Sequence, residues 1–231
     1  MSGDDDLIRE MREYYQARAP WHDEYMSYSD NASMEELLRP IVATVAELLA
    51  GRDVLEVACG TGNWTQVLAR RCPRVVATDA CEGVLSLARK KEYRGGDVTF
   101  LAADAYSLQD VPARFAGAFA ADWLSHVPRG QMSRFLEVLH GHLGEGARVV
   151  FIDVLRRDHP DLKPYRRDDE GNLFCRRTLP DGTVYDVVKN YPTEGELRCM
   201  IEGVGQEADY RQWPGLARWL LTYVVIDSLE R

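Results

Sequence analysis

The apolar positions of the first fifty residues recur every three or four residues. This spacing predicts helices over residues 7–50. Ser33 is the expected N-cap of the last of them, because Glu36 follows three residues later and completes a capping box. Gly51 is expected to end this helix, since glycine readily adopts the left-handed conformation that closes helices.

From residue 53 the pattern changes to short apolar runs that alternate with helical segments. Helices are expected over residues 64–71, 81–91 and 131–143, and strands over residues 54–57, 75–78, 98–101, 115–121 and 148–152. Strands that alternate with helices predict a parallel sheet covered on both faces. The runs are apolar throughout, as the strands of such a doubly covered sheet are.

The last third of the chain has a different pattern. Residues 156–172 are polar and are expected to form a surface loop. Two β-prone runs, residues 174–179 and 184–190, surround Asp181-Gly182, a pair typical of hairpin turns. Beyond them, residues 207–213 and 219–226 predict two strands that form an antiparallel edge of the main sheet.

Size and charge narrow the class of protein. A chain of 231 residues fits one α/β domain with appendages. Its formal net charge of −9 disfavours general binding to nucleic acid, although Arg166, Arg167, Arg176 and Arg177 could form a local basic patch. The five cysteines include no Cys-x-x-Cys pair, which argues against a zinc site or a disulfide framework. Without a signal peptide or a membrane-spanning run, the chain is expected to be cytoplasmic.

The loop of residues 56–62 carries the first chemical signal. A glycine loop between a strand and a helix lets backbone N–H groups approach a ligand, and both dinucleotides and S-adenosylmethionine use this device. The dinucleotide fingerprint needs a third glycine where this chain, after Gly60 and Gly62, has Thr65. Glu56 would repel a pyrophosphate but suits the sulfonium and ammonium groups of S-adenosylmethionine.

The pattern Glu56-x-Ala58-x-Gly60-x-Gly62 resembles motif I of the class I S-adenosylmethionine-dependent methyltransferases, with alanine in place of the usual first glycine. The resemblance extends over nearly the whole chain, from about residue 14 to residue 226. It implies a Rossmann-like seven-stranded mixed sheet of order 3-2-1-4-5-7-6, with the last strand antiparallel and helices on both faces. Residues 1–231 would form a single domain: a helical lid (1–50), a cofactor-binding core (51–155), a loop and hairpin cap (156–192), and the last helix and edge strands (193–231).

The same resemblance implies how the cofactor S-adenosyl-L-methionine is held. Asp79, 19 residues after Gly60, matches the acid that binds the ribose hydroxyls, and Asp104-Ala105 matches the pair that holds adenine. Tyr15 is expected over the methionine end of the cofactor. The complete set of expected cofactor contacts is Tyr15, Glu56, Ala58, Gly60, Gly62, Asp79, Ala80, Asp104, Ala105, Ala121 and Asp122.

His126 is the expected catalytic residue, because it follows the fourth strand and a histidine can deprotonate a hydroxyl or an amine near neutral pH. The expected reaction is methyl transfer to an oxygen or nitrogen of a small molecule, by a monomer or homodimer that binds neither nucleic acid nor membrane and uses no metal. Three alternatives remain open from the sequence: an NAD-dependent oxidoreductase, a methyltransferase that modifies protein side chains, and a cofactor-binding protein without catalytic activity.

Overall fold

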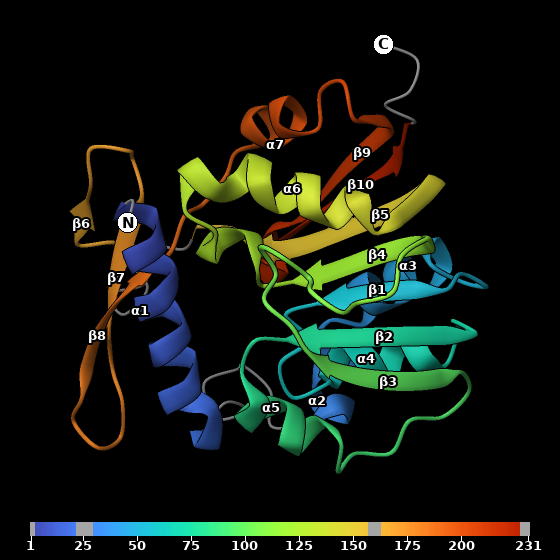
Figure 1. Cartoon of the computed structure of the whole chain (residues 1–231), viewed down its shortest axis with the longest axis horizontal. Helices are drawn as coiled ribbons and strands as arrows, with labels where there is room; N and C mark the ends of the chain where they lie inside the picture. Colours follow the sequence, from blue (N-terminus) through green and yellow to red (C-terminus); the bar gives the residue numbers. More distant parts are fainter. Residues whose placement is uncertain (1–2, 22–29, 157–162, 227–231) are drawn as a thin grey trace.

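The computed structural model describes residues 3–21, 30–156 and 163–226. Its centre is a seven-stranded sheet of order β3-β2-β1-β4-β5-β10-β9 (Figure 1). The strands are β1 (Val54–Val57), β2 (Arg74–Asp79), β3 (Asp97–Ala102), β4 (Phe115–Ala121), β5 (Leu143–Val154), β9 (Gly205–Trp213) and β10 (Arg218–Val225). Strands β1 to β5 are parallel, whereas β10 is antiparallel to both of its neighbours. The predicted strand order is therefore confirmed, once the three strands of a second sheet are left out of the count.

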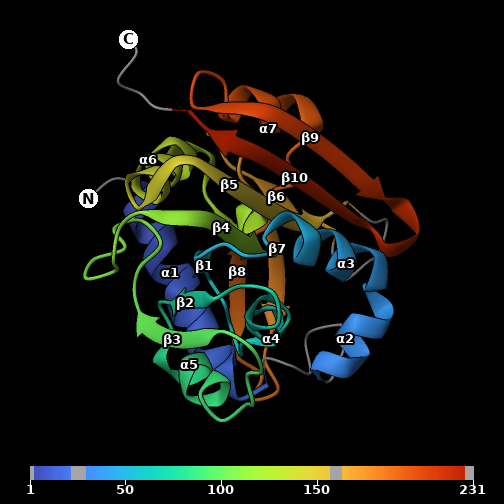
Figure 2. The same cartoon turned by 90° about the vertical axis from the view of Figure 1, so that its right-hand side faces the viewer.

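Helices cover both faces of this sheet. The helices are α1 (Gly3–Arg18), α2 (Asn31–Leu37), α3 (Arg39–Leu48), α4 (Asn63–Ala69), α5 (Glu82–Ala88), α6 (Met132–Gly141) and α7 (Glu194–Met200), of which α1 lies at the end of the strands rather than on a face. Helices α6 and α7 lie on one face, and α2, α3 and α4 lie on the other (Figure 2). Their buried side chains belong to two separate apolar clusters. The inner strands β1, β2 and β4 are largely buried and apolar because each face is covered, whereas the edge strand β9 is mostly polar. None of the helices in the described ranges is long and apolar enough to cross a membrane.

The N-cap expected at Ser33 is wrong. Asp30 is the N-cap of α2: its Oδ1 accepts a hydrogen bond from the Ser33 backbone N–H at 2.8 Å, and the Ser33 hydroxyl accepts one from the Asp30 N–H at 3.1 Å. Ser33 thus fills the third helical position, where a glutamate was expected to act. The helix is also divided near Leu38, because Pro40 has no backbone N–H to continue the first segment.

Other boundaries also differ from the sequence prediction, and the short strand β6 (Arg166–Arg167) lies within the loop predicted over residues 156–172, because it pairs with the next strand of the chain. The expected helix over residues 131–143 ends earlier, and β5 already begins at Leu143. Gly146 lies inside this strand with a φ of 70°, next to an irregularity in the register between β4 and β5. A glycine that was expected to separate two elements therefore allows a bend within one of them.

A second, three-stranded sheet lies beside the first. It consists of β6 (Arg166–Arg167), β7 (Leu173–Thr178) and β8 (Val184–Val188), which confirms the predicted hairpin. Met11 and Tyr14 of α1 share an apolar cluster with Phe174 and Val188 of this sheet. Together α1 and the small sheet face the carboxyl ends of the parallel strands (Figure 1). The N-terminal helix and the hairpin thus form a cap at the edge where α/β sheets bind ligands.

Candidate cofactor and acceptor site

The loop between β1 and α4 depends on backbone conformations that favour glycine. Gly60 and Gly62 have φ values of 56° and 78°. A Cβ atom on Gly62 would lie 2.3 Å from the Tyr93 hydroxyl, so this position has no room for a side chain. Ala58 adopts a φ of 55°, a conformation that costs an L-residue roughly 1–2 kcal/mol. The loop therefore keeps the shape expected for it, with local strain where alanine replaces glycine.

Glu56 lies at the end of β1 with its side chain buried. Its Oε2 accepts a hydrogen bond from the Thr65 hydroxyl at 2.6 Å. Burial raises the pKa of Glu56 to about 8, and the negative charge of Asp79 adds to this increase. Without a ligand, the carboxyl group is therefore mostly protonated at neutral pH.

Asp79 joins the loop to the next strand. Its Oδ2 accepts a hydrogen bond from the Gly60 N–H at 2.9 Å, and its Oδ1 accepts one from the Cys81 N–H at 2.8 Å. A carboxylate has about four lone-pair sites, so each oxygen can still accept a hydroxyl proton from a ligand. The side chain can thus shape the loop and bind a ribose at the same time.

Asp104 lies after the end of β3 and has a comparable arrangement. Its Oδ1 accepts a hydrogen bond from the Tyr106 N–H at 3.1 Å, and its Oδ2 pairs with the Arg12 guanidinium at 2.7 Å. Arg12 belongs to α1, so this ion pair joins the core to the cap. The backbone of Ala105 follows directly, where the sequence placed the adenine contact.

A cavity of about 520 Å³ lies at this edge of the sheet. This volume is in the range of small-molecule binding sites. The structure brings every predicted site residue except Gly62 into the lining, whereas Gly62 caps the following helix. The predicted residues in the lining are Tyr15, Glu56, Ala58, Gly60, Asp79, Ala80, Asp104, Ala105, Ala121, Asp122 and His126.

His126 is partly buried and lines this cavity on the cap side. Its Nδ1 lies 2.7 Å from the Val188 carbonyl oxygen, which can only accept a hydrogen bond, so Nδ1 carries the proton. The lone pair of the neutral ring is therefore on Nε2, which lies 3.3 Å from the Lys189 ammonium. Burial, together with the charge of Lys189, holds the pKa of His126 well below its usual value.

Two other predicted contacts lie around this histidine. Tyr15 packs its ring edge-on against His126, with the ring centroids 5.5 Å apart, and the Arg18 guanidinium lies 4.9 Å from the centre of the tyrosine ring. Asp122, just past β4, forms an ion pair with Arg218 at 2.5 Å. Its φ of 54° turns the chain sharply after the strand.

The sequence prediction missed the basic residues of the cavity. Lys189, Arg177 and Arg218 all belong to its lining. Lys189 is only 7% exposed, donates a hydrogen bond to the Ser125 hydroxyl at 2.7 Å and lies 3.7 Å from Asp153. The sequence does contain a signal for Lys189, because this lysine directly follows the apolar pair Val187-Val188 in a β-prone run. Arg177 was singled out only as part of a basic patch.

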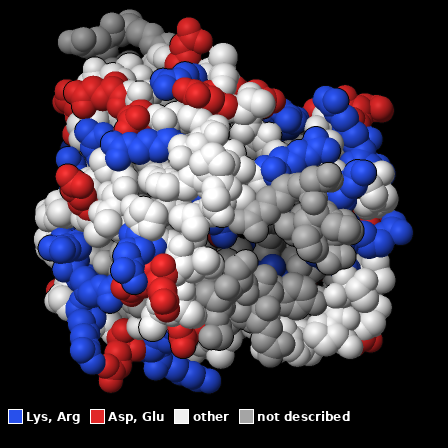
Figure 3. All heavy atoms as spheres, turned by 180° about the vertical axis from the view of Figure 1, so that it is seen from behind, with Lys and Arg blue, Asp and Glu red and all other residues white. Residues whose placement is uncertain are grey.

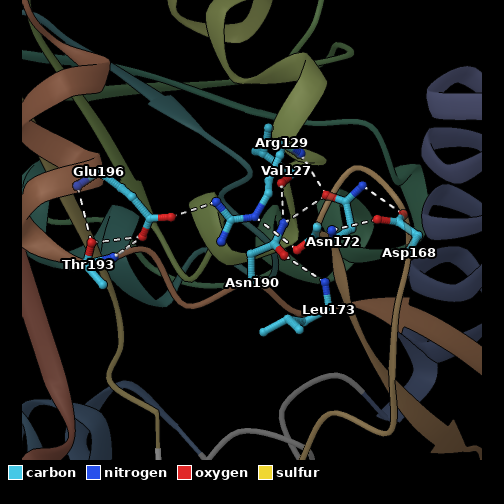
Figure 4. A network of polar contacts seen from close by, with 9 residues as sticks. Val127, Arg129, Asp168, Asn172, Leu173, Asn190, Thr193 and Glu196 are labelled. Carbon is cyan, nitrogen blue, oxygen red and sulfur yellow. Dashed lines mark hydrogen bonds and ion pairs between the residues drawn. The ribbon is translucent and has the colours of Figure 1, made fainter.

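A polar network holds the small sheet against the core next to the cavity (Figure 4). The buried Asn190 side chain accepts a hydrogen bond from the Leu173 N–H at 3.0 Å and donates one to the Val127 carbonyl at 3.0 Å. Arg129 binds Asn172 through its backbone N–H and Glu196 through its side chain. These contacts fix the end of β8, and with it the position of the neighbouring lysine.

Replacing Asn190 with Ala is expected to lower the free energy of unfolding by roughly 1–2 kcal/mol, because a buried N–H and a buried carbonyl lose their partner. Urea denaturation would measure this change. The control is Gln206→Ala, which removes an exposed side-chain amide from the edge strand β9 and should change stability little. A loss for Asn190→Ala no larger than that of the control would contradict the role of the network.

Comparison with known proteins identifies the family of this chain. Residues 54–146 match the model of a protein family described as a methyltransferase domain. The chain is 35% identical over 174 residues to a 2-phytyl-1,4-naphtoquinone methyltransferase of Thermosynechococcus vestitus, covering 70% of this chain and 75% of that one. It is 30% identical over 165 residues to a ubiquinone biosynthesis O-methyltransferase of Azotobacter vinelandii, covering 68% of this chain. The matched part spans only 66% of that relative's length.

Solved structures of similar proteins match a larger part of the chain than these sequence relatives do. The structure of DhpI in complex with SAM and HEP has a TM-score of 0.75 and 26% identity, and the match covers 96% of this chain and 99% of that one. A Burkholderia thailandensis 1,6-didemethyltoxoflavin-N1-methyltransferase has a TM-score of 0.64 and 20% identity, over 98% of this chain and 92% of that one. The second likeness shows a shared fold.

Proposed function

The chain belongs to the class I S-adenosylmethionine-dependent methyltransferases, and from this premise we propose that it transfers a methyl group from S-adenosyl-L-methionine to an oxygen or nitrogen of a small molecule. One observation supports this most strongly. The glycine loop and the acidic groups Glu56, Asp79 and Asp104, which follow three different strands, line a single cavity. Parallel strands bring these separate sequence positions to one edge of the sheet.

The residues present fit the cofactor. Asp79 offers carboxylate oxygens to ribose hydroxyls, and Ala80 and Ala105 leave room for a flat adenine ring. Glu56 lies where a positively charged group would stabilise its ionised form. When bound, S-adenosylmethionine supplies an electrophilic methyl group on a sulfonium, and the cap would exclude water around it.

We propose that His126 acts as general base through Nε2, its one basic site. The Lys189 ammonium lies 3.3 Å from this nitrogen, but it also contacts the Ser125 hydroxyl and the Asp153 carboxylate. An acceptor hydroxyl or amine could therefore take the place of the ammonium beside the ring. The low pKa keeps the ring neutral throughout the physiological range but also makes Nε2 a weak base. Because the charge of Lys189 contributes to the low pKa, moving the ammonium away from the ring would make Nε2 more basic.

Titration with S-adenosylhomocysteine and with NADH tests the cofactor assignment. We expect S-adenosylhomocysteine to bind and NADH not to bind, and tight binding of NADH alone would refute the proposal. Incubation with methyl-labelled S-adenosylmethionine and a metabolite mixture then tests the reaction. Label in small molecules supports it, whereas label that appears only in protein would favour a protein side chain as acceptor.

Binding of S-adenosylhomocysteine at pH 7 is expected to release about one proton, because Glu56 is protonated in the free protein and ionises next to the ligand's ammonium. Affinity should therefore rise with pH until it levels off near pH 8. Calorimetry in buffers of different ionisation enthalpy counts the released protons. The Glu56→Gln variant should release none, and an unchanged count in that variant would assign the proton to another group.

The remaining part of the proposal concerns partners and location. We propose a monomer or homodimer without nucleic-acid or membrane partners, since the chain is acidic and its cavity has the size of a small-molecule site. A cytoplasmic location is supported by the five cysteines, none of which forms a disulfide in the part of the chain that the structure describes. Size-exclusion chromatography with light scattering measures the oligomeric state.

A further inference from the structure

The cap contributes positive charge to the cavity at the side away from the glycine loop. Arg177 of β7 and Lys189, which follows β8, both belong to the lining. Figure 3, which views the molecule from behind relative to Figure 1, shows Lys or Arg atoms within a hollow of the surface. Arg176, the preceding residue of the same strand, points to the opposite face of the small sheet and binds Asp186. Only one of the two neighbouring arginines therefore faces the cavity.

Arg177 and Lys189 are two of several cations in the lining, and they lie within electrostatic reach of one another. After the larger effect of burial, the charges of Lys189, Arg18 and Arg177 all lower the pKa of His126. Arg177 also lowers the pKa of Lys189, whereas the nearby Asp153 raises it. Two like charges that share a poorly solvated cavity repel each other, so an anion placed between them would stabilise both.

The acidic groups of the lining either pair with other arginines or lie on the glycine-loop side of the cavity. Asp104 pairs with Arg12, and Asp122 pairs with Arg218. Glu56 and Asp79 lie at the ends of β1 and β2, on the glycine-loop side. Behind the lining, Asp153 lies 3.7 Å from Lys189. The acceptor side itself is lined by the cations of the cap and by aromatic rings, which include Tyr15 and Trp123.

We propose that the acceptor is an organic anion, a carboxylate or a phosphoryl compound with an aromatic or apolar body, whose charged group binds Arg177 and Lys189. This inference rests on the proposed function and deepens it, because it assigns the substrate class and two specificity-determining residues. A guanidinium can bind either oxyanion through two parallel hydrogen bonds, and the ammonium adds a second positive charge.

Binding to the protein saturated with S-adenosylhomocysteine tests this assignment. Benzoate and phenyl phosphate serve as the two anionic probes, and benzamide is the neutral probe with the shape of benzoate. We expect at least one anion to bind at least about tenfold more tightly than benzamide, as measured by calorimetry. The preferred anion shows whether the site takes carboxylates or phosphoryl groups.

Variants locate the binding site. Arg177→Gln should weaken anion binding about tenfold and leave the affinity for S-adenosylhomocysteine unchanged, whereas Arg176→Gln should alter neither. Lys189→Gln should also weaken anion binding, with its fold checked by circular dichroism. Equal binding of benzamide, no binding of any probe, or equal effects of the two arginine variants would overturn the inference. Absence of S-adenosylhomocysteine binding would instead refute the proposed function itself.

Discussion

Replacing Asp79 with Ala is expected to weaken S-adenosylhomocysteine binding by roughly 1–3 kcal/mol, or about 5- to 150-fold, as measured by calorimetry. The ligand would lose its ribose hydrogen bonds. In addition, the Gly60 and Cys81 N–H groups would lose the carboxylate that now accepts from both of them, so the glycine loop would lose part of its support. An unchanged affinity would rule out a ribose role for this residue.

A second ligand separates these two effects. The 2′-deoxy analogue of S-adenosylhomocysteine lacks one hydroxyl, so it should bind the unmodified protein more weakly than the parent ligand does. If Asp79 accepts from that hydroxyl, the Asp79→Ala variant should discriminate much less between the two ligands. If Asp79 only shapes the loop, the variant should discriminate as strongly as before. Asp53→Ala, at the opposite end of β1 and paired with Arg74, is the matched acidic control and should bind both ligands normally.

Replacing His126 with Ala is expected to lower kcat about 10²-fold or more, with little change in the affinity for S-adenosylhomocysteine. The variant removes Nε2, the proposed proton acceptor, and leaves the cofactor side of the cavity intact. Steady-state kinetics with the identified acceptor measure the loss. A kcat within about threefold of the unmodified enzyme would leave His126 as a residue that only orders the loop after β4.

His140→Ala is the matched control for this variant. His140 is also partly buried, and its Nε2 shares a hydrogen bond of 2.7 Å with the Tyr223 hydroxyl. Burial lowers its pKa to about 4. It lies on α6, outside the cavity lining. Its loss should therefore reduce stability but not kcat, which separates the effect of losing a partly buried histidine from the effect of losing the base.

The pH dependence follows from the lowered pKa of His126. Because the folded protein keeps this ring neutral while the unfolded chain takes up a proton below about pH 6.5, the contribution of His126 makes stability fall as the pH drops below that value. Above it both states are neutral and this contribution is constant. For the same reason the base is already available at pH 6.5, so kcat should not rise further through a titration of this histidine between pH 7 and 8.

Local patterns, together with the family resemblance, were sufficient to predict which residues line the glycine-loop side of the cavity. Gly60, Asp79 and Asp104 follow strands whose apolar runs are visible in the sequence, and parallel strands must place their carboxyl ends at one edge. The alternation of strands and helices likewise predicted the sheet, and the family resemblance predicted its order. Local signals were less reliable at helix ends, where Asp30 rather than Ser33 is the cap, because several nearby polar residues can cap the same helix.

The acceptor side depended on the tertiary structure. Lys189 lies 63 residues from His126 along the chain, and the ring and the ammonium meet only because the small sheet packs against the core. The sequence by itself determined the sheet, the glycine loop and the acids that accompany it, since these follow from short-range periodicity and strand direction. Only the tertiary structure decided which of two neighbouring arginines faces the cavity and which nitrogen of His126 is basic, because burial and contacts between distant segments determine both.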